Sequence, residues 1–222
     1  MNFIKYSISI LILLIVNGCV SSIPLNQNLY SNGNKMGVIV RVSDITVAQI
    51  GSRGLLDIAL TPGNRFKEPL AKIDSTFDFK NEIKAEVNSM LTGKGKNYEF
   101  LPDDIDWNSI EKFRAPSESK LNYADLDFRP LKEKYGVDEI LFVDVYYGLA
   151  VGYYGMIETG KDGFATIRAE VVRLSNNSLL VREHIDSYGK MKGNWKKDEY
   201  DNLRNAIIKA MNSSVQKMKE KF

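Results

Sequence analysis

The stretch of residues 137–151, VDEILFVDVYYGLAV, decides the fold that we expect for this chain. Residues two apart share one face of an extended strand, so the stretch divides into two faces. The first face carries Leu141, Val143, Val145, Tyr147, Leu149 and Val151, and the second carries Ile140, Phe142, Tyr146 and Ala150. Because both faces are largely apolar, we expect a strand that is buried on both sides at the centre of a sheet.

Four further strands are predicted around this one. Residues 164–174 and 179–187 are rich in apolar side chains, and the turn-forming sequence Ser-Asn-Asn-Ser joins them at 175–178. Together with the central strand they should form an antiparallel meander. Residues 36–42 are β-branched and apolar and should form the first strand, and residues 98–101 a short one.

Three helices are expected to pack on the sheet. A capping signal at residues 75–78 opens an amphipathic stretch that ends at Gly93, and a short helix over residues 127–135 ends at Gly136. A long amphipathic helix closes the chain, since apolar side chains recur there at steps of three and four. They are Tyr200, Leu203, Ile207, Met211, Val215 and Met218.

Two regions are expected to be mostly loop. Residues 51–72 contain several glycines and prolines, with a short strand at 55–60, and residues 102–122 are polar and irregular. The whole pattern predicts an α+β fold: a mixed sheet with a C-terminal antiparallel meander, helices packed on it, and a long C-terminal amphipathic helix.

The composition narrows the function classes. The chain has 222 residues, 30 Lys and Arg against 28 Asp and Glu, and a net charge of +2, so the whole molecule has no field that would attract nucleic acid. It contains one cysteine and one histidine, which excludes an intramolecular disulfide and any metal site or catalytic scheme that needs two of either residue. We therefore expect one ordinary globular domain without a cofactor.

The first 18 residues are typical of a secretory signal peptide. A basic residue, Lys5, precedes an apolar run over residues 8–16. This run is far shorter than the roughly 20 residues that cross a bilayer as a permanent helix, so a retained membrane anchor is the weaker alternative. Ordinary secretion is the other.

The end of this run favours a lipid anchor. Val16-Asn17-Gly18-Cys19 resembles the lipobox of bacterial lipoproteins, although Ala, Ser or Thr is more usual at the place of Asn17. The resemblance implies that Cys19, the only cysteine of the chain, is acylated after cleavage of residues 1–18, and that Val20 as second residue directs the protein to the outer membrane, facing the periplasm. Residues 19–35 are then expected to be a lipidated tether and residues 36–222 a single domain.

A second resemblance concerns the middle of the chain. Residues 134–143, KYGVDEILFV, followed by a meander, look like the small periplasmic α/β domains of outer-membrane lipoproteins of the curli-secretion and penicillin-binding-protein activator types. This resemblance implies binding to an envelope partner or assembly into a ring. It assigns no role to a particular residue.

Two stretches resemble a nucleotide-binding and a calcium-binding motif, but each lacks a residue that its motif requires. Residues 155–162, GMIETGKD, match the phosphate-binding loop except at the last position, where Asp162 replaces Ser or Thr, and a strand rather than a helix follows. We expect a hairpin there with Asp162 and Gly163 at its tip, and no nucleotide. Residues 104–108, DIDWN, begin like a calcium loop, but Ala115 stands where the bidentate carboxylate is needed, so no metal is expected.

Two polar positions on strands are candidates for chemistry. His184 and Asp186 share one face of their predicted strand, but they make no catalytic triad by themselves. Asp144 lies between Val143 and Val145 in the strand that should be most buried, and a buried carboxylate needs a partner. Asp144 is therefore either a structural ion pair or a functional carboxylate.

Tyrosines and glycines alternate in the same strand and its continuation. Together with Asp144, the side chains of Tyr146, Tyr147, Tyr153 and Tyr154 are the candidate binding surface. Two other interpretations remain for this stretch. The simpler one is a curved structural strand, and the other is a hairpin that inserts in a membrane as one unit of a pore.

From these patterns we expect a non-enzymatic, membrane-anchored bacterial lipoprotein whose periplasm-facing domain binds an envelope protein. The alternatives are a subunit of a lipid-anchored ring or pore, and a small-ligand carrier or hydrolase of unrecognised type.

Overall fold

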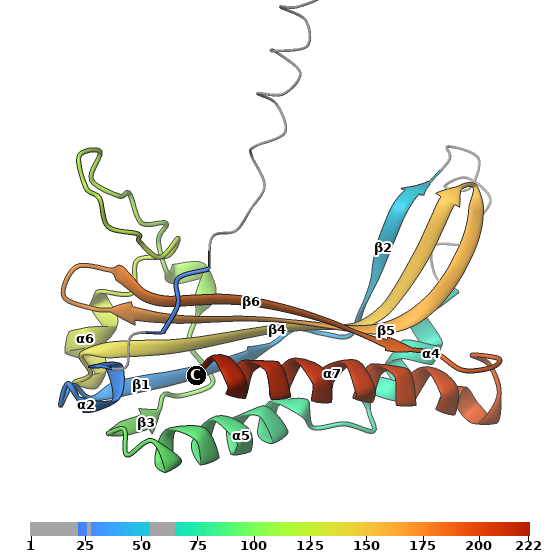
Figure 1. The fold of residues 1–222 in the computed structure, drawn as a ribbon, viewed down its shortest axis with the longest axis horizontal. Coiled ribbons are helices and arrows are strands. Elements are labelled where there is room, and N and C mark those ends of the chain that lie inside the picture. The colour runs from blue at the N-terminus through green and yellow to red at the C-terminus, as the bar shows by residue number, and fades with distance from the viewer. Residues whose placement is uncertain (1–21, 26–27, 54–64) are drawn as a thin grey trace, which may run out of the picture.

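The computed structural model describes residues 22–25, 28–53 and 65–222. They form one six-stranded mixed sheet with the order β3-β1-β4-β5-β6, in which β2 also pairs with β4 (Figure 1). This confirms the predicted α+β class with a C-terminal meander and a long C-terminal helix.

The strands are organised around β4 (Glu139–Gly155), which is central as predicted. It pairs antiparallel with β5 (Ile157–Arg173), which pairs in turn with β6 (Ser178–Lys190), and these three make the meander. On its other side β4 pairs in parallel with two short strands in succession, β1 (Met36–Val42) and β2 (Thr46–Arg53). The short strand β3 (Tyr98–Phe100) pairs in parallel with β1 at the edge.

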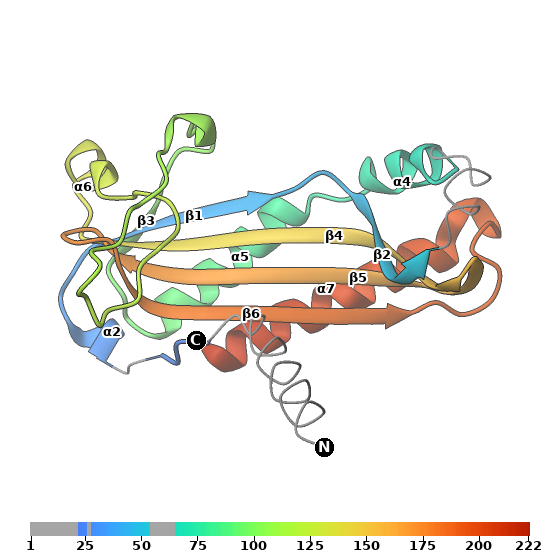
Figure 2. The same cartoon turned by 90° about the horizontal axis from the view of Figure 1, so that it is seen from above.

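Two long helices cover one face of this sheet (Figures 1 and 2). They are α5 (Phe79–Gly93), which begins where the carboxylate of Asp78 accepts a hydrogen bond from the backbone N–H of Asn81, and α7 (Asp201–Lys221). Shorter helices are α2 (Asn28–Ser31), α4 (Lys67–Asp74) and α6 (Pro130–Tyr135), with single 3-10 turns η1 (Trp107–Ser109) and η2 (Asp198–Tyr200).

The main core lies between the sheet and these helices. The predicted first face of β4 contributes all six of its apolar side chains, and α5 and α7 contribute their apolar stripes. The helix α7 packs unusually close to the sheet at two glycines. A Cβ atom at Gly189 would lie 1.9 Å from the carbonyl oxygen of Ala206, and one at Gly163 would lie 2.3 Å from the same oxygen.

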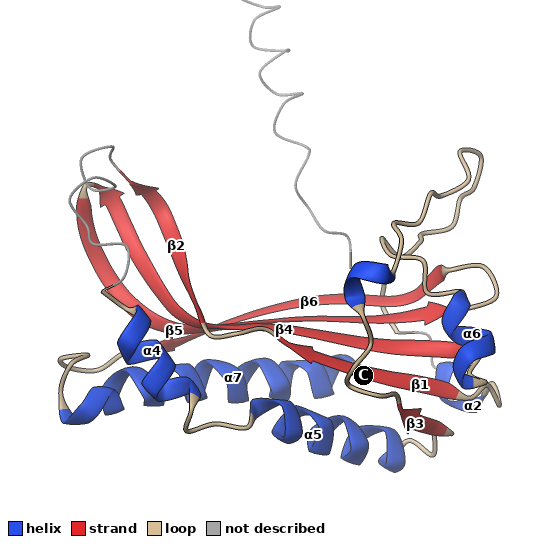
Figure 3. Cartoon of the chain, turned by 180° about the vertical axis from the view of Figure 1, so that it is seen from behind, coloured by secondary structure: helices blue, strands red, loops and turns tan. Residues whose placement is uncertain are grey.

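Among the described residues, no long helix lies on the opposite face of β1, β4, β5 and β6, and we call it the helix-free face. At one end a smaller apolar cluster covers it, in which Phe142 and Ile140 of β4 pack against Phe128, Leu131 and Trp107. Figure 3 shows the loop segment that supplies this cover beside α6. Towards the middle of the sheet, polar side chains replace the apolar ones.

The far end of the sheet bends towards the helix-free side (Figures 1 and 3). We call this part the wing: β2 together with residues 148–155 of β4 and 157–163 of β5. The bend begins at Gly148, whose φ is +146°, and a Cβ there would lie 2.0 Å from the carbonyl oxygen of Thr46. Only glycine allows β2 to approach β4 this closely.

Two predictions about this region need correction. The strand β2 and the helix α4 each lie partly in residues 51–72, which were predicted to be mostly loop; α4 tolerates Pro69 because the proline lies in its first turn. The hairpin tip is at Gly155 and Met156, not at Asp162 and Gly163, since β5 pairs with β4 from Ile157 onward. The strand predicted at 55–60 lies outside the described residues.

The segment before β1 also differs from a flexible tether in its described part. Leu29 of α2 is buried, and its carbonyl oxygen accepts a hydrogen bond of 2.7 Å from Lys96 Nζ. Lys96 forms a buried ion pair of 3.0 Å with Glu139, whose other carboxylate oxygen accepts hydrogen bonds from the side-chain amides of Asn32 and Asn34. The polar residues that suggested a tether therefore satisfy a buried carboxylate.

Candidate functional site

A row of ionisable side chains crosses the middle of the helix-free face. The strand registers place Arg41 of β1 opposite Asp144 of β4, Asp144 opposite Arg168 of β5, and Arg168 opposite His184 of β6. Directly opposed residues point to the same face, so the four side chains form one line across the sheet. The part of this line on β4, β5 and β6 lines a pocket of about 260 Å³, to which Asp125 of the preceding loop contributes.

Asp144 is buried, with 3% of its side chain exposed, and it has a partner. Arg41 donates two hydrogen bonds to it, Nε to Oδ1 at 2.7 Å and Nη2 to Oδ2 at 2.5 Å, and this pairing raises the pKa of the guanidinium. The guanidinium also lies 5.1 Å from the ring centre of Trp107 and 5.3 Å from that of Phe142. The pair is therefore held in one orientation by its hydrogen bonds and by two aromatic rings.

Next to this pair, two arginines share one buried carboxylate. Glu170 has 2% of its side chain exposed; Arg182 Nε donates to its Oε1 at 2.8 Å, and Arg168 Nε lies 3.5 Å from the same oxygen. Asp125 lies 3.7–3.8 Å from both guanidiniums. Arg168 Nε and Arg182 Nη2 are buried atoms without a hydrogen-bond partner. Arg168 lines the pocket and is 32% exposed, so its guanidinium can donate a hydrogen bond to an additional acceptor there.

His184 and Asp186 lie at the exposed end of the same face, as their spacing predicts. His184 Nε2 is 3.3 Å from Asp186 Oδ2, and Thr166 donates a hydrogen bond of 2.7 Å to the other carboxylate oxygen. The pair is half-exposed and belongs to the polar surface around the pocket.

The structure separates the tyrosines of the candidate binding surface. Tyr146 lies on the helix-free face beside Asp144, and its hydroxyl oxygen accepts a hydrogen bond of 3.3 Å from Arg41. Tyr147 faces the main core and donates to the carboxylate of Asp74; burial, followed by the interaction with Asp74, raises its pKa.

Further along the hairpin the tyrosines separate again. Tyr153 is buried, and Arg65 donates to its hydroxyl, whereas Tyr154 is largely exposed at the end of the wing. Asp144 and Tyr146 thus share one surface, Tyr147 and Tyr153 face the helix side, and Tyr154 stands apart.

Sequence reasoning missed Arg41, Arg168, Glu170 and Arg182. A signal for them exists, because charged residues alternate with apolar ones in the strands that became β5 and β6. A single charge also interrupts each of two apolar strands, Arg41 in one and Asp144 in the other.

Most of the large apolar side chains that remain exposed lie on the helix-free side of the molecule. Those in β2, β4, β5 and β6 and in the turn between β4 and β5 lie on the helix-free face or at the wing's end, and one more lies in the loop segment before α6. They are Ile50, Leu121, Tyr146, Tyr154, Met156, Ile157 and Tyr188.

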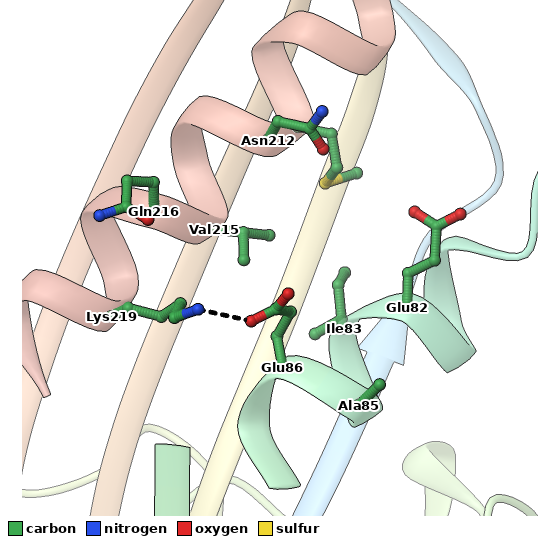
Figure 4. Close-up of a pocket in the computed structure, with 9 residues that line it drawn as sticks. Glu82, Ile83, Ala85, Glu86, Asn212, Val215, Gln216 and Lys219 are labelled. Carbon is green, nitrogen blue, oxygen red and sulfur yellow. Dashed lines mark hydrogen bonds and ion pairs between the residues drawn. The ribbon is translucent and has the colours of Figure 1, made fainter. Parts of the chain in front are cut away.

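A second hollow, of about 380 Å³, lies between α5 and α7 on the other side of the molecule. Figure 4 shows Ile83 and Val215 directed between the two helices, and the ion pair of 2.7 Å between Glu86 and Lys219 crosses the gap. The hollow is a seam between packed helices that this ion pair bridges.

The remaining sequence candidates are placed as follows. Cys19 lies outside the described residues. Gly160 and Lys161 lie within β5, so the segment that resembles a phosphate-binding loop is a strand hairpin. In the described part of the chain, no group of three or more His, Cys, Asp or Glu side chains is arranged to hold a metal ion. None of the helices described here has both the length and the apolar character of a membrane span.

Comparisons with known proteins give distant structural likenesses only. No family model and no curated protein matches the chain. Among solved structures, it resembles a hypothetical protein of Chlamydia trachomatis, with 9% identity over 85% of this chain and 97% of that one and a TM-score of 0.38. A lipoprotein of Neisseria meningitidis matches with 12% identity over 83% and 99% of the two chains and a TM-score of 0.35. A PelC variant of Paraburkholderia phytofirmans, solved as a dodecamer, matches with 11% identity over 86% and 95% and a TM-score of 0.30.

These neighbours thus include a bacterial lipoprotein. With TM-scores below 0.5, these likenesses assign no role to the chain.

Proposed function

We propose that this protein is a lipid-anchored bacterial envelope protein that binds another envelope protein through the helix-free face, without catalysing a reaction. The observation that carries the proposal is the row from Arg41 to His184, a line of ionisable side chains on a sheet face that none of the described long helices covers. The Val16–Cys19 pattern supports the lipid anchor and, through Val20, an outer-membrane location facing the periplasm.

The chemistry of the face suits a protein partner. The Arg41–Asp144 pair is rigid, Tyr146 beside it is half-exposed, and arginine and tyrosine are the residue types that dominate binding energy in protein interfaces. The Arg168 side chain is 32% exposed, so its guanidinium can donate hydrogen bonds to an acceptor group of the partner. We therefore expect hydrogen-bond-accepting groups on the partner surface.

The test compares two variants of the tagged, lipidated protein after reversible cross-linking in living cells. In one variant Tyr146→Ala and Arg168→Gln change the helix-free face; in the matched control Glu82→Ala and Ser89→Ala change exposed positions of α5 on the other side. We expect one envelope protein to co-purify in stoichiometric yield with the wild type and the control, and at a yield at least tenfold lower with the first variant.

Three results would contradict the proposal. They are equal recovery with both variants, recovery of the protein alone, and turnover of a cell-wall or lipid substrate that is lost on Asp144→Asn or His184→Gln.

A further inference from the structure

The end of the wing carries an exposed apolar tip. Tyr154 is 79% exposed, Ile157 68% and Met156 55%, although these are large apolar side chains. Tyr154 and Ile157 are direct cross-strand partners in the hairpin, so they point to the same side, and Met156 lies in the turn between them. Ile50 of β2, which pairs with Gly152, is exposed next to them. Such a group on a small domain indicates a surface that covers it in the cell.

The wing and the start of the folded domain lie on the same side of the sheet. The wing bends away from α5 and α7, and the first described segment, residues 22–25, lies on the same helix-free side (Figure 1). There Ile23 packs against the smaller apolar cluster and its backbone bonds to that of Arg182 in β6. Ser22 is the third residue after Cys19, and three residues span at most about 10 Å. A lipid on Cys19 would therefore hold the helix-free side close to the membrane.

The shape and chemistry of the tip favour lipid over protein. A stable protein interface buries about 800 Å² on each partner, which a projecting turn with a few side chains does not provide. A bilayer accepts a convex apolar projection, and tyrosine is suited to its interface, where the ring lies among acyl chains and the hydroxyl in water. The carboxylate of Glu158, which follows Ile157 in the chain, forms ion pairs with Arg65 and Lys161, and these reduce its repulsion from an anionic lipid surface.

We propose that the tip formed by Tyr154, Met156 and Ile157 inserts into the lipid surface that holds the anchor on Cys19. The orientation of the domain in this proposal rests on the lipid anchor of the proposed function. The helix-free face then looks towards the membrane, with the wing tip as its second point of attachment, and the partner is one that lies at the membrane surface.

The first experiment measures the depth of the tip in a bilayer. The lipidated chain carries Ile157→Cys, or Ser89→Cys on the helix side as the matched control, and each new thiol is labelled with an environment-sensitive fluorophore. An acylated Cys19 sulfur does not react with the label, so the new thiol is unique. The proteins are placed in vesicles of phosphatidylethanolamine and phosphatidylglycerol with brominated acyl chains. We expect the bromines to quench the fluorophore at position 157 at least twofold and to leave that at 89 unchanged.

A second experiment separates the tip from the anchor. The same labels are used in the Cys19→Ser chain with an excess of vesicles. We expect quenching at position 157 there too, and vesicle affinity at least tenfold lower when Tyr154→Ser and Met156→Ser are added. Equal solvent exposure of both labels in both experiments would overturn the tip proposal. Reaction of Cys19 itself with the label in the wild-type chain would refute the anchor alone and leave the second experiment to decide on the tip.

Discussion

At the scale of single residues, the Arg41–Asp144 pair controls the candidate site. The carboxylate is buried on a sheet face, so its negative charge depends on one guanidinium that also lies against two aromatic rings. Such a pair positions both side chains, but it adds little net stability, because removing two charges from water costs about as much as their attraction returns. We therefore infer that the role of the pair is to hold both side chains in place on the surface, not to stabilise the fold.

Removing only one partner should be costly. We expect Arg41→Met to lower the free energy of unfolding by about 3 kcal/mol, because it leaves a buried carboxylate without its cation. The double variant Arg41→Met/Asp144→Leu should recover most of this loss, since two apolar groups of similar size replace both charges. Urea unfolding of the three proteins measures the effect. A single variant as stable as the wild type would contradict the assignment.

The buried phenols make the alkaline stability of the fold predictable. Burial raises the pKa of Tyr30 to about 12, and burial together with Asp74 raises that of Tyr147 further. In the unfolded chain both phenols ionise near pH 10, which is about two pH units or more below the pH at which they ionise in the folded protein. The unfolded state therefore loses protons first, and stability that is fully present below pH 10 falls as the pH rises through 10 to 12.

We expect Tyr147→Phe to reduce this alkaline loss. At pH 7 the variant should be less stable by about 1 kcal/mol, because the hydrogen bond to Asp74 is missing. Between pH 10 and 12 its free energy of unfolding should fall less steeply than that of the wild type. Tyr154→Phe, changed at the exposed tip, is the control, and urea unfolding at each pH gives the slopes. Parallel slopes for the wild type and Tyr147→Phe would contradict the burial of this phenol.

At the scale of elements, the contact between α7 and the sheet depends on two glycines. A Cβ atom at Gly189 would overlap the backbone of Ala206, whereas the surroundings of Gly160, another glycine of the meander, are open within 4 Å. Gly189→Ala should therefore lower the free energy of unfolding by about 1–3 kcal/mol, the usual cost of overpacking. Gly160→Ala should change it by less than about 0.5 kcal/mol. Similar losses in the two variants would mean that α7 lies farther from β6.

The elements that sequence reasoning found are those with strong local patterns. The central strand β4, the helices α5 and α7 and the left-handed cap at Gly136 follow from apolar spacing and capping chemistry. The strand β2 was missed because half of its eight residues are polar and it contains a glycine, and because it is held by parallel pairing with a partner about 100 residues away. No local pattern encodes that pairing.

The candidate site shows the same limit. Asp144 and Tyr146 were predicted as neighbours on one strand, and they do lie together. Arg41 could not be assigned to them, since only the register between β1 and β4 brings it opposite Asp144. The prediction that Tyr146 and Tyr147 share one surface was wrong, because consecutive residues of a strand point to opposite faces of the sheet. Tyr153 is separated from Tyr154 for the same reason.

At the scale of the whole molecule, the two sides of the sheet have different roles in our account. The helix side holds the main core, and its exposed surface is charged. The helix-free side carries the ionisable row, most of the exposed large apolar side chains, the wing and the first described residues of the domain. The central claim is that this side faces the membrane and the protein partner.

Site-specific photo-cross-linking in living cells tests that claim most directly. A photoreactive phenylalanine analogue is placed at Tyr146 on the helix-free face or at Ser89 on α5, in otherwise unchanged, lipidated protein. We predict one discrete protein adduct from position 146, lost when Cys19→Ser removes the anchor, and no adduct from position 89. Adducts from position 89 with none from position 146 would contradict the account.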